Sequence, residues 1–176
     1  MVNAKEKKSK IEIAGEDFFN YAIEREDVKY LMDHLPEEAD IKRVKVEYEL
    51  PILKIISVGW AITYHLENNP VKEPLSEIYW KAIYEFSQSL SETTELMIGQ
   101  DIDYFQILRE RLDMYVDALS KKTEIQDPAQ IIGPEFAKIC GNQDDLFAAM
   151  TGAKMFFNII TRVNQYLESA KLSYRL

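Results

Sequence analysis

Apolar residues recur at a helical spacing along most of this chain, and the most apolar segment runs from Leu50 to Leu66. Ile56, Val58 and Trp60 make much of its circumference apolar. A helix that is apolar nearly all round has neighbours nearly all round, so we expect this segment to form a central helix. The row with the three-four spacing of a core-facing side is Ile41, Val44, Tyr48, Ile52, Ile55, Gly59, Ile62 and Leu66.

The central helix is expected to start at residue 37 or 40 and to end near residue 68, where Asn69-Pro70 stops it. Pro51 lies inside this span, and it either kinks one long helix or opens a second one. We favour one kinked helix, because the apolar row stays in phase through the proline. A strand over 44–50 would also fit the alternation there, but no other segment resembles a partner strand.

Further helices follow from the same periodicity and from residues that start or stop helices. The first closes at Pro36, since the residue before a proline avoids helical angles. Gly99 ends the next, Asp101 caps the one after it, and Asp144 or Asp145 opens the last. The expected spans are 16–34, 74–98, 101–121 and 145–171, with short helical turns over 127–133 and 134–140.

The inward faces of these helices follow from their apolar rows, which include Leu90 and Met97 in 74–98 and Leu146 in 145–171. The link between 74–98 and 101–121 is so short that these two helices should be antiparallel neighbours. Small side chains line one flank of the last helix. Since small residues let two helices approach closely, we predict contact between Gly59 and Gly152.

These elements together predict an all-α fold, a single-domain bundle of about six helices around a central apolar helix. The length of 176 residues favours one domain with a sizeable core. The bundle is expected to span residues 16–176. Residues 1–15 carry several lysines without a sustained period, and we expect them to form a mobile basic N-terminal tail.

The charge balance narrows the classes of partner. The net charge is −9 and the isoelectric point about 4.8, so the surface repels phosphate, and we expect neither nucleic acid nor membrane as partner. The window 50–66 is short for a bilayer and contains Lys54. A single cysteine, Cys140, fits a reducing compartment. The first ten residues lack the pattern of a signal peptide, so we expect a cytoplasmic protein.

Residue types that serve catalysis or metal binding are sparse in this sequence. His34 and His65 each end a predicted helix, where a cationic side chain favours the negative end of the helix dipole. The sequence has no Glu-x-x-His pair, cysteine cluster, glycine-rich phosphate loop or nucleophile elbow. Cys140 follows a predicted helix, a position that does not activate a thiol, so we interpret it as a small buried residue. No cofactor is expected.

One acidic pattern resembles a known signature. Glu92-x-x-Glu95 and Glu110-x-x-Asp113 are similar to the magnesium-binding carboxylates of the all-α nucleotide pyrophosphohydrolases of the MazG and dimeric dUTPase type. The resemblance implies four carboxylates that face each other across two helices and hold magnesium against the phosphates of a nucleotide. Helical phase, however, turns both pairs away from the apolar faces of their helices, toward solvent unless another helix covers them.

An aromatic pattern indicates a binding surface instead. Trp80 and Tyr84 lie four residues apart and point away from the apolar row of their helix, and Ile107 and Met114 do so on the next helix. Aromatic residues and methionine are enriched at protein interfaces. If these side chains are uncovered, they form a surface for a protein partner or for a second copy in a homodimer.

We therefore expect a non-catalytic helical protein that acts by protein-protein binding or self-association. The alternatives are a magnesium-dependent nucleotide pyrophosphohydrolase that uses Glu92, Glu95, Glu110 and Asp113, and a carrier of small molecules with an apolar pocket between helices. The sequence identifies neither the partner nor the oligomeric state.

Overall fold

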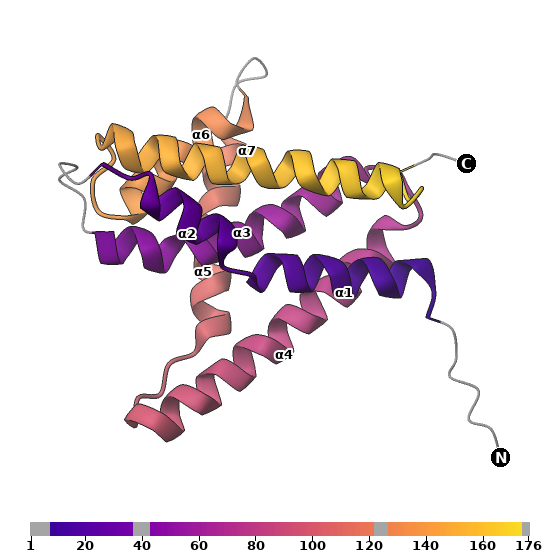
Figure 1. Cartoon of the computed structure of the whole chain (residues 1–176), viewed down its shortest axis with the longest axis horizontal. Helices are drawn as coiled ribbons and strands as arrows, with labels where there is room; N and C mark the ends of the chain where they lie inside the picture. The colour runs from indigo at the N-terminus through magenta and orange to yellow at the C-terminus, as the bar shows by residue number, and fades with distance from the viewer. Residues whose placement is uncertain (1–7, 37–42, 122–126, 174–176) are drawn as a thin grey trace.

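The computed structural model describes residues 8–36, 43–121 and 127–173, and these residues form seven helices and no strand (Figure 1). The predicted all-α class is confirmed. One buried apolar cluster takes side chains from all seven helices. The helices are α1 (Lys10–Ile23), α2 (Glu26–Asp33), α3 (Arg43–His65), α4 (Lys72–Ile98), α5 (Tyr104–Ser120), α6 (Pro128–Ile139) and α7 (Leu146–Ser169).

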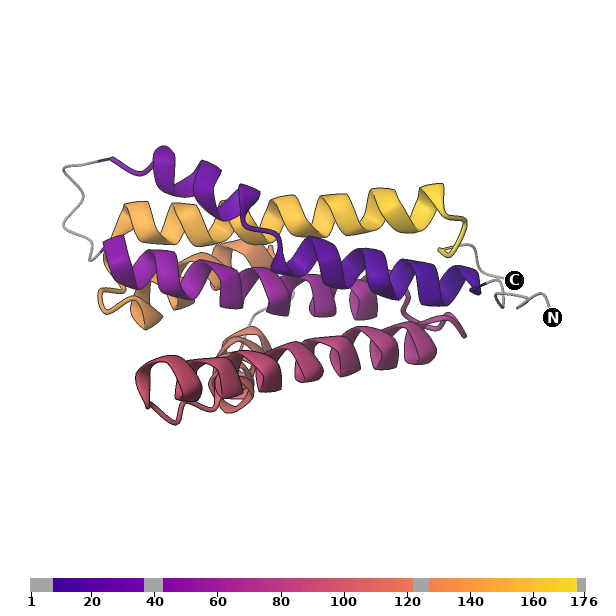
Figure 2. The ribbon, with the colours of Figure 1, turned by 60° about the horizontal axis from the view of Figure 1, so that its bottom comes forward.

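The predicted central helix is α3, which packs against each of the other six helices and runs through the middle of the bundle (Figure 2). Gly59, Ile62 and Leu66 are buried, as their spacing predicts. Pro51 lies inside one continuous helix, which confirms a single element rather than two. Residues 37–42, which hold the expected start of this helix and Ile41, lie outside the described residues.

In the first half of α3, the residues that face the core are not those of the expected apolar row. Val44 is 81% exposed and Tyr48 is also exposed, whereas Val46, Leu50 and Leu53 are buried. The helix is apolar on several sides, so side-chain hydrophobicity alone did not determine its rotation. Tertiary contacts determine it instead, because charged side chains described below bind the inward face of these turns.

The expected helix over 16–34 is two helices, and it begins earlier than expected. Lys10 starts α1, where Ser9 and Glu12 form a reciprocal capping box that satisfies exposed backbone N–H groups. Residues 8–15 therefore do not belong to a tail, and residues 1–7 lie outside the described part. The chain leaves the helix at Glu24, which is extended, with φ −64° and ψ 140°. Lys54 of α3 donates to the Glu24 carbonyl oxygen at 2.9 Å and so binds an acceptor at the break.

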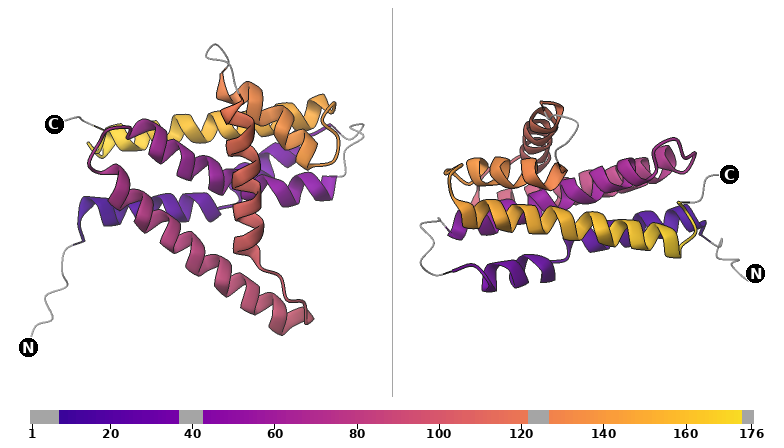
Figure 3. Two further views of the ribbon diagram at one scale, coloured as in Figure 1. Left: turned by 180° about the vertical axis from the view of Figure 1, so that it is seen from behind. Right: turned by 90° about the horizontal axis from the view of Figure 1, so that it is seen from above.

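Helices α4 and α5 reverse direction at Gly99, which takes the left-handed conformation, with φ 67°. The cap of α5 is Asp103 rather than the expected Asp101, and its side chain accepts from the Gln106 N–H at 2.9 Å. The two helices contact each other but splay apart from the link like the arms of a V (Figures 1 and 3). Their shared end projects beyond the other helices.

The two short turns expected between 127 and 140 are one helix, α6, which Asp127 caps and which contains Pro134. Asp145 caps α7 by accepting from the N–H groups of Phe147 and Ala148, so one of the two expected starts is confirmed. Pro134, the seventh residue of α6, has no N–H to donate to the Gln130 carbonyl oxygen, yet the helix continues through it to Ile139.

The predicted contact between Gly59 and Gly152 is wrong. A Cβ atom at Gly59 would clash with the Trp80 ring of α4, and one at Gly152 would lie 2.6 Å from Phe136 Cβ of α6. The small flank of α7 therefore admits α6 rather than α3. Gly133 completes this close approach, because a Cβ atom there would lie 2.5 Å from the Ala149 carbonyl oxygen.

Candidate binding surfaces

Trp80 and Tyr84, the aromatic half of the predicted patch, contact neighbouring helices. The Trp80 indole is half-buried, lies over Gly59 and meets the Tyr79 ring edge-on at 5.2 Å between centroids. Tyr84 is exposed on one side and meets the Phe105 ring of α5 edge-on at 5.0 Å. Much of this aromatic surface therefore joins α4 to α3 and α5.

Ile107 and Met114, the other half of that patch, lie on a different flank of α5. Both are half-buried. At about 100° per residue, Met114 points about 180° away from Phe105 around the helix, and Ile107 about 160° away. Since Phe105 faces Tyr84, the four side chains do not form one continuous surface.

Glu92, Glu95, Glu110 and Asp113 are all exposed. Within the described part of the chain, the only side-chain hydrogen bond of this set joins the Gln106 amide to Glu110 at 3.2 Å along α5. Across the described ranges, no group of three or more His, Cys, Asp or Glu side chains is placed to hold a metal ion. The geometry that the resemblance implies, with the carboxylates facing one another, is therefore not assembled within this chain.

The two histidines bind backbone carbonyl groups. His34 Nδ1 lies 2.7 Å from the Tyr30 carbonyl oxygen, and His65 Nε2 lies 3.2 Å from that of Ile160 on α7. Burial lowers the pKa of His65 below its ordinary value, against the opposing effect of the Ile160 carbonyl. The neutral imidazole can donate this hydrogen bond. The sequence predicted a cationic histidine that interacts with the helix dipole, but burial favours the neutral form of His65.

Cys140 is buried, as the sequence predicts. Burial, followed by the charge of Glu49, raises the pKa of its thiol to about 12. A thiol with so high a pKa is almost entirely protonated at neutral pH and is a poor nucleophile.

A charged cluster surrounds the break between α1 and α2. Lys54 is completely buried, and its ammonium group lies 2.9 Å from an Asp27 carboxylate oxygen and 4.4 Å from the centroid of the Tyr21 ring. Arg162 of α7 reaches the same carboxylate at 3.1 Å. Burial and the nearby Asp27 charge raise the pKa of Tyr21 to about 12. The cluster joins α1, α2, α3 and α7.

A second buried charge joins α3 to α5. Glu49 is buried, and both its oxygens accept from the Arg111 guanidinium at 2.9 Å. Lys45 approaches the same carboxylate at 3.4 Å. Such a two-bond pair fixes orientation as well as distance. Sequence reasoning missed both clusters, although the sequence shows a charged residue inside the apolar segment 50–66, Lys54, and another directly before it, Glu49.

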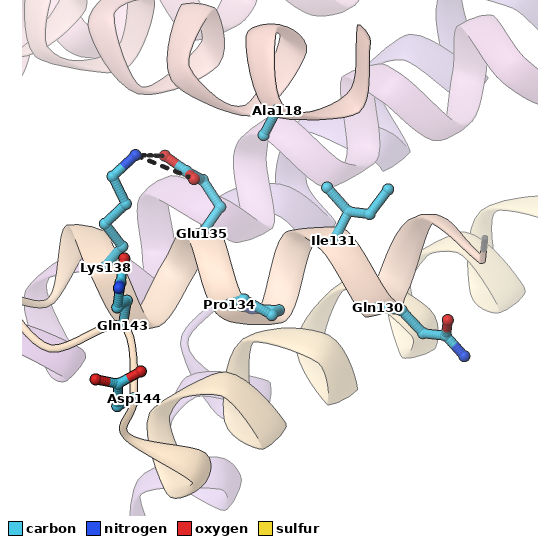
Figure 4. A pocket seen from close by; sticks show the side chains of 8 residues that line it. All are labelled: Ala118, Gln130, Ile131, Pro134, Glu135, Lys138, Gln143 and Asp144. Atoms are coloured by element: carbon cyan, nitrogen blue, oxygen red, sulfur yellow. Dashed lines mark hydrogen bonds and ion pairs between the residues drawn. The ribbon is translucent and has the colours of Figure 1, made fainter. Parts of the chain in front are cut away.

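Two open grooves are lined mainly by polar and charged side chains. One, of about 390 Å³, lies between α5 and α6, where Ala118 is opposite Ile131 (Figure 4). Glu135 and Lys138 on its rim pair with each other at 3.3 Å. The other, of about 620 Å³, lies between α2 and the first turns of α3. Because neither is a closed apolar cavity, they offer little support for a carrier of small molecules.

Exposed apolar side chains gather on the outer face of α7. Leu146 is 74% exposed and Phe157 is 59% exposed, and Met150 and Phe147 are exposed as well. At about 100° per residue, Leu146, Met150 and Phe157 lie within about 40° of one another around the helix. We call these four residues the α7 stripe. The expected inward position of Leu146 is wrong, since the row that packs inward is Ala148, Gly152, Met155, Phe156, Ile159, Val163 and Leu167.

A second exposed apolar surface lies at the end of α4. It comprises Leu90, Leu96, Met97 and Ile98, which we call the α4 tip. Leu90 and Met97 were expected to face the core. The structure places them beyond it, because the end of α4 extends past the helices that would cover it (Figure 1).

Among the described residues, no helix has the length and apolar character that crossing a bilayer requires. Comparison of the chain with protein-family models, with curated proteins and with solved structures found no match.

Proposed function

We propose that this chain is a non-catalytic helical protein that acts by protein-protein binding or self-association, and that the α7 stripe carries the self-association. The supporting observation is the exposure of Leu146, Phe147, Met150 and Phe157 along one side of a long helix. Contiguous exposed apolar surface of this kind is typical of interaction sites in water-soluble proteins.

The neighbourhood of the α7 stripe suits an interface. Tyr64 of α3 is exposed and stacks on Trp60 at 4.6 Å, and Trp60 meets the Phe156 ring of α7 at 5.3 Å. Aromatic side chains therefore lie beside the stripe. Interface centres are rich in such residues, which bury a large area at a small cost in side-chain entropy.

The charge of α7 favours a second copy as the partner. Although the whole chain carries a net charge of −9, no acidic residue occurs between Asp145 and Glu168. Two copies that meet along α7 therefore place their least acidic surfaces together, which limits like-charge repulsion. A surface that contacts itself in this way gives a two-fold dimer. The proposal includes a cytoplasmic location, for which the single thiol is the support.

Sedimentation equilibrium of the full chain tests the proposal. We expect a monomer–dimer equilibrium in the micromolar range, which the stripe variant Met150→Ser/Phe157→Ser shifts toward monomer by at least about tenfold in dissociation constant. The matched control is the tip variant Leu96→Ser/Met97→Ser, which removes two apolar side chains that are even more exposed than those of the stripe and should leave the equilibrium unchanged. A wild-type protein that remains monomeric at several hundred micromolar would refute self-association.

A further inference from the structure

We infer that the α4 tip binds a basic, amphipathic helical segment of a partner protein. This inference adds a surface and a partner of defined chemistry to the proposed function, and it does not depend on the α7 stripe. Leu96 is 88% exposed and Met97 is 78% exposed, and no residue over the whole range 89–107 is buried. The tip therefore contributes nothing to the core that would account for its apolar side chains.

The apolar face of the tip continues a face that already binds a helix. Nearer the start of α4, Ile78 packs against Gly15 of α1, and Phe86 meets the Phe19 ring of α1 at 6.0 Å. Leu90, Leu96 and Met97 extend this side of α4 over about the next three turns. The two helices diverge along this direction, so α1 does not cover the extension (Figures 1 and 3). The uncovered side thus suits a helix.

The charge around the tip determines the chemistry of that helix. No lysine or arginine occurs between Lys81 and Arg109, whereas five acidic residues do. All five are exposed, so none of their charges is buried in the core beside a basic side chain. They are Glu85, Glu92, Glu95, Asp101 and Asp103. An apolar surface whose charged neighbours in the sequence are all acidic is complementary to a helix with an apolar stripe and lysine or arginine beside it.

The tip is held in place before any partner binds. The Tyr104 N–H donates to the Ser91 hydroxyl oxygen at 3.2 Å, and the Thr94 hydroxyl lies 3.4 Å from that of Tyr104. Tyr84 and Phe105 bridge the two arms of the V. These contacts fix the end of α4 against α5, so a partner would bind a largely preformed surface.

Titration with synthetic peptides tests the inference. The probe is a fluorescein-labelled helical peptide of about 18 residues with leucine on one face and lysine on the other. Two matched peptides carry glutamate in place of lysine, or the same composition in a scrambled order. Anisotropy is measured on the full chain, on the tip variant Leu96→Ser/Met97→Ser, on Glu92→Gln/Glu95→Gln, and on the stripe variant Met150→Ser/Phe157→Ser.

We expect the lysine peptide to bind, the glutamate peptide not to bind and the scrambled peptide to bind weakly. The tip variant and the glutamine variant should each weaken binding by about tenfold, while the stripe variant leaves it unchanged. Equal weakening by the stripe variant, or equal binding of the scrambled peptide, would overturn the inference. A loss of self-association by the tip variant in sedimentation without peptide would also overturn the inference, because the α4 tip would then bind a second copy of this chain. Circular dichroism verifies that each variant is folded.

Discussion

At the scale of single residues, the two buried charges of α3 explain how this helix is oriented. Lys54 and Glu49 are buried, yet each meets a partner of opposite charge at 2.9 Å, Asp27 for Lys54 and Arg111 for Glu49. A buried ion pair costs desolvation energy, so it adds little net stability relative to apolar residues, but loss of one partner is strongly unfavourable. These pairs therefore specify the position of α3 against its neighbours.

Substitution of Lys54 tests this account. In Lys54→Met the Asp27 carboxylate loses its buried cation and the Glu24 carbonyl loses a donor. Because Arg162 still pairs with Asp27, we expect a loss of about 1–3 kcal/mol in the free energy of unfolding, measured by urea denaturation. The control Lys81→Met, at an exposed lysine of α4, should change it by less than about 0.5 kcal/mol. Similar values for the two variants would exclude a structural role for the buried pair.

His65 should give the protein a specific dependence on pH. Its pKa is lowered in the folded state, chiefly by burial. As the pH falls below about 6.5, the histidine of the unfolded chain is protonated first, so the unfolded state binds more protons and stability falls. Between pH 7.5 and 5 we expect His65→Asn to lose less stability than the wild type. Identical slopes for His65→Asn and the wild type would contradict the assignment.

At the scale of elements, the most extensive contact between two described helices is that of α6 with α7. Gly133, Gly152 and Ala149 leave no space between these helices for larger side chains. The sequence predicted a close approach along this flank of α7 but assigned it to α3. Small residues indicate that another helix comes close but do not specify which one. The sequence predicted two short turns in place of α6, so α6 was not considered as the neighbour.

Gly133→Ala tests the close approach. The added Cβ atom would lie 2.5 Å from the Ala149 carbonyl oxygen, a backbone atom that moves only with the whole helix. We expect the free energy of unfolding to fall by about 1–3 kcal/mol, despite the better helix propensity of alanine. Gln130→Ala, at an exposed position of α6, should leave stability within about 0.5 kcal/mol of wild type. A more stable Gly133→Ala protein would show that the two helices can separate at little cost.

At the scale of the molecule, periodicity predicted the helical class and the identity of the central helix, because both depend on long apolar rows. Faces at the ends of helices were less predictable. Leu90, Met97 and Leu146 continue apolar rows and so were expected to be inward, yet other helices stop short of them or pass on another side. Whether an apolar row is covered depends on where its neighbours end, and the sequence of one helix does not contain that information.

The positions of neighbouring helices also explain why the predicted aromatic patch and the observed exposed surfaces differ. Trp80 and Tyr84 were candidates for a binding surface because they point away from the apolar row, but Trp80 packs over Gly59 and Tyr84 meets the Phe105 ring. Of the exposed residues that support the proposed function, Leu146 continues an expected apolar row, whereas Phe147, Met150 and Phe157 lie beside it. The resulting molecule has two exposed apolar surfaces of different charge, the α7 stripe without acidic residues and the α4 tip without basic ones.

Chemical cross-linking at the centre of the α7 stripe tests the proposed self-association most directly. Lys154 lies between Met150 and Phe157 and is exposed, so Lys154→Cys in a Cys140→Ala background leaves the apolar side chains intact. With a short bis-maleimide, we expect a covalent dimer in high yield, and only monomer for Lys29→Cys on α2 in the same background. Equal yields from the two positions, or no dimer from Lys154→Cys at concentrations where the protein sediments as a dimer, would contradict association through α7.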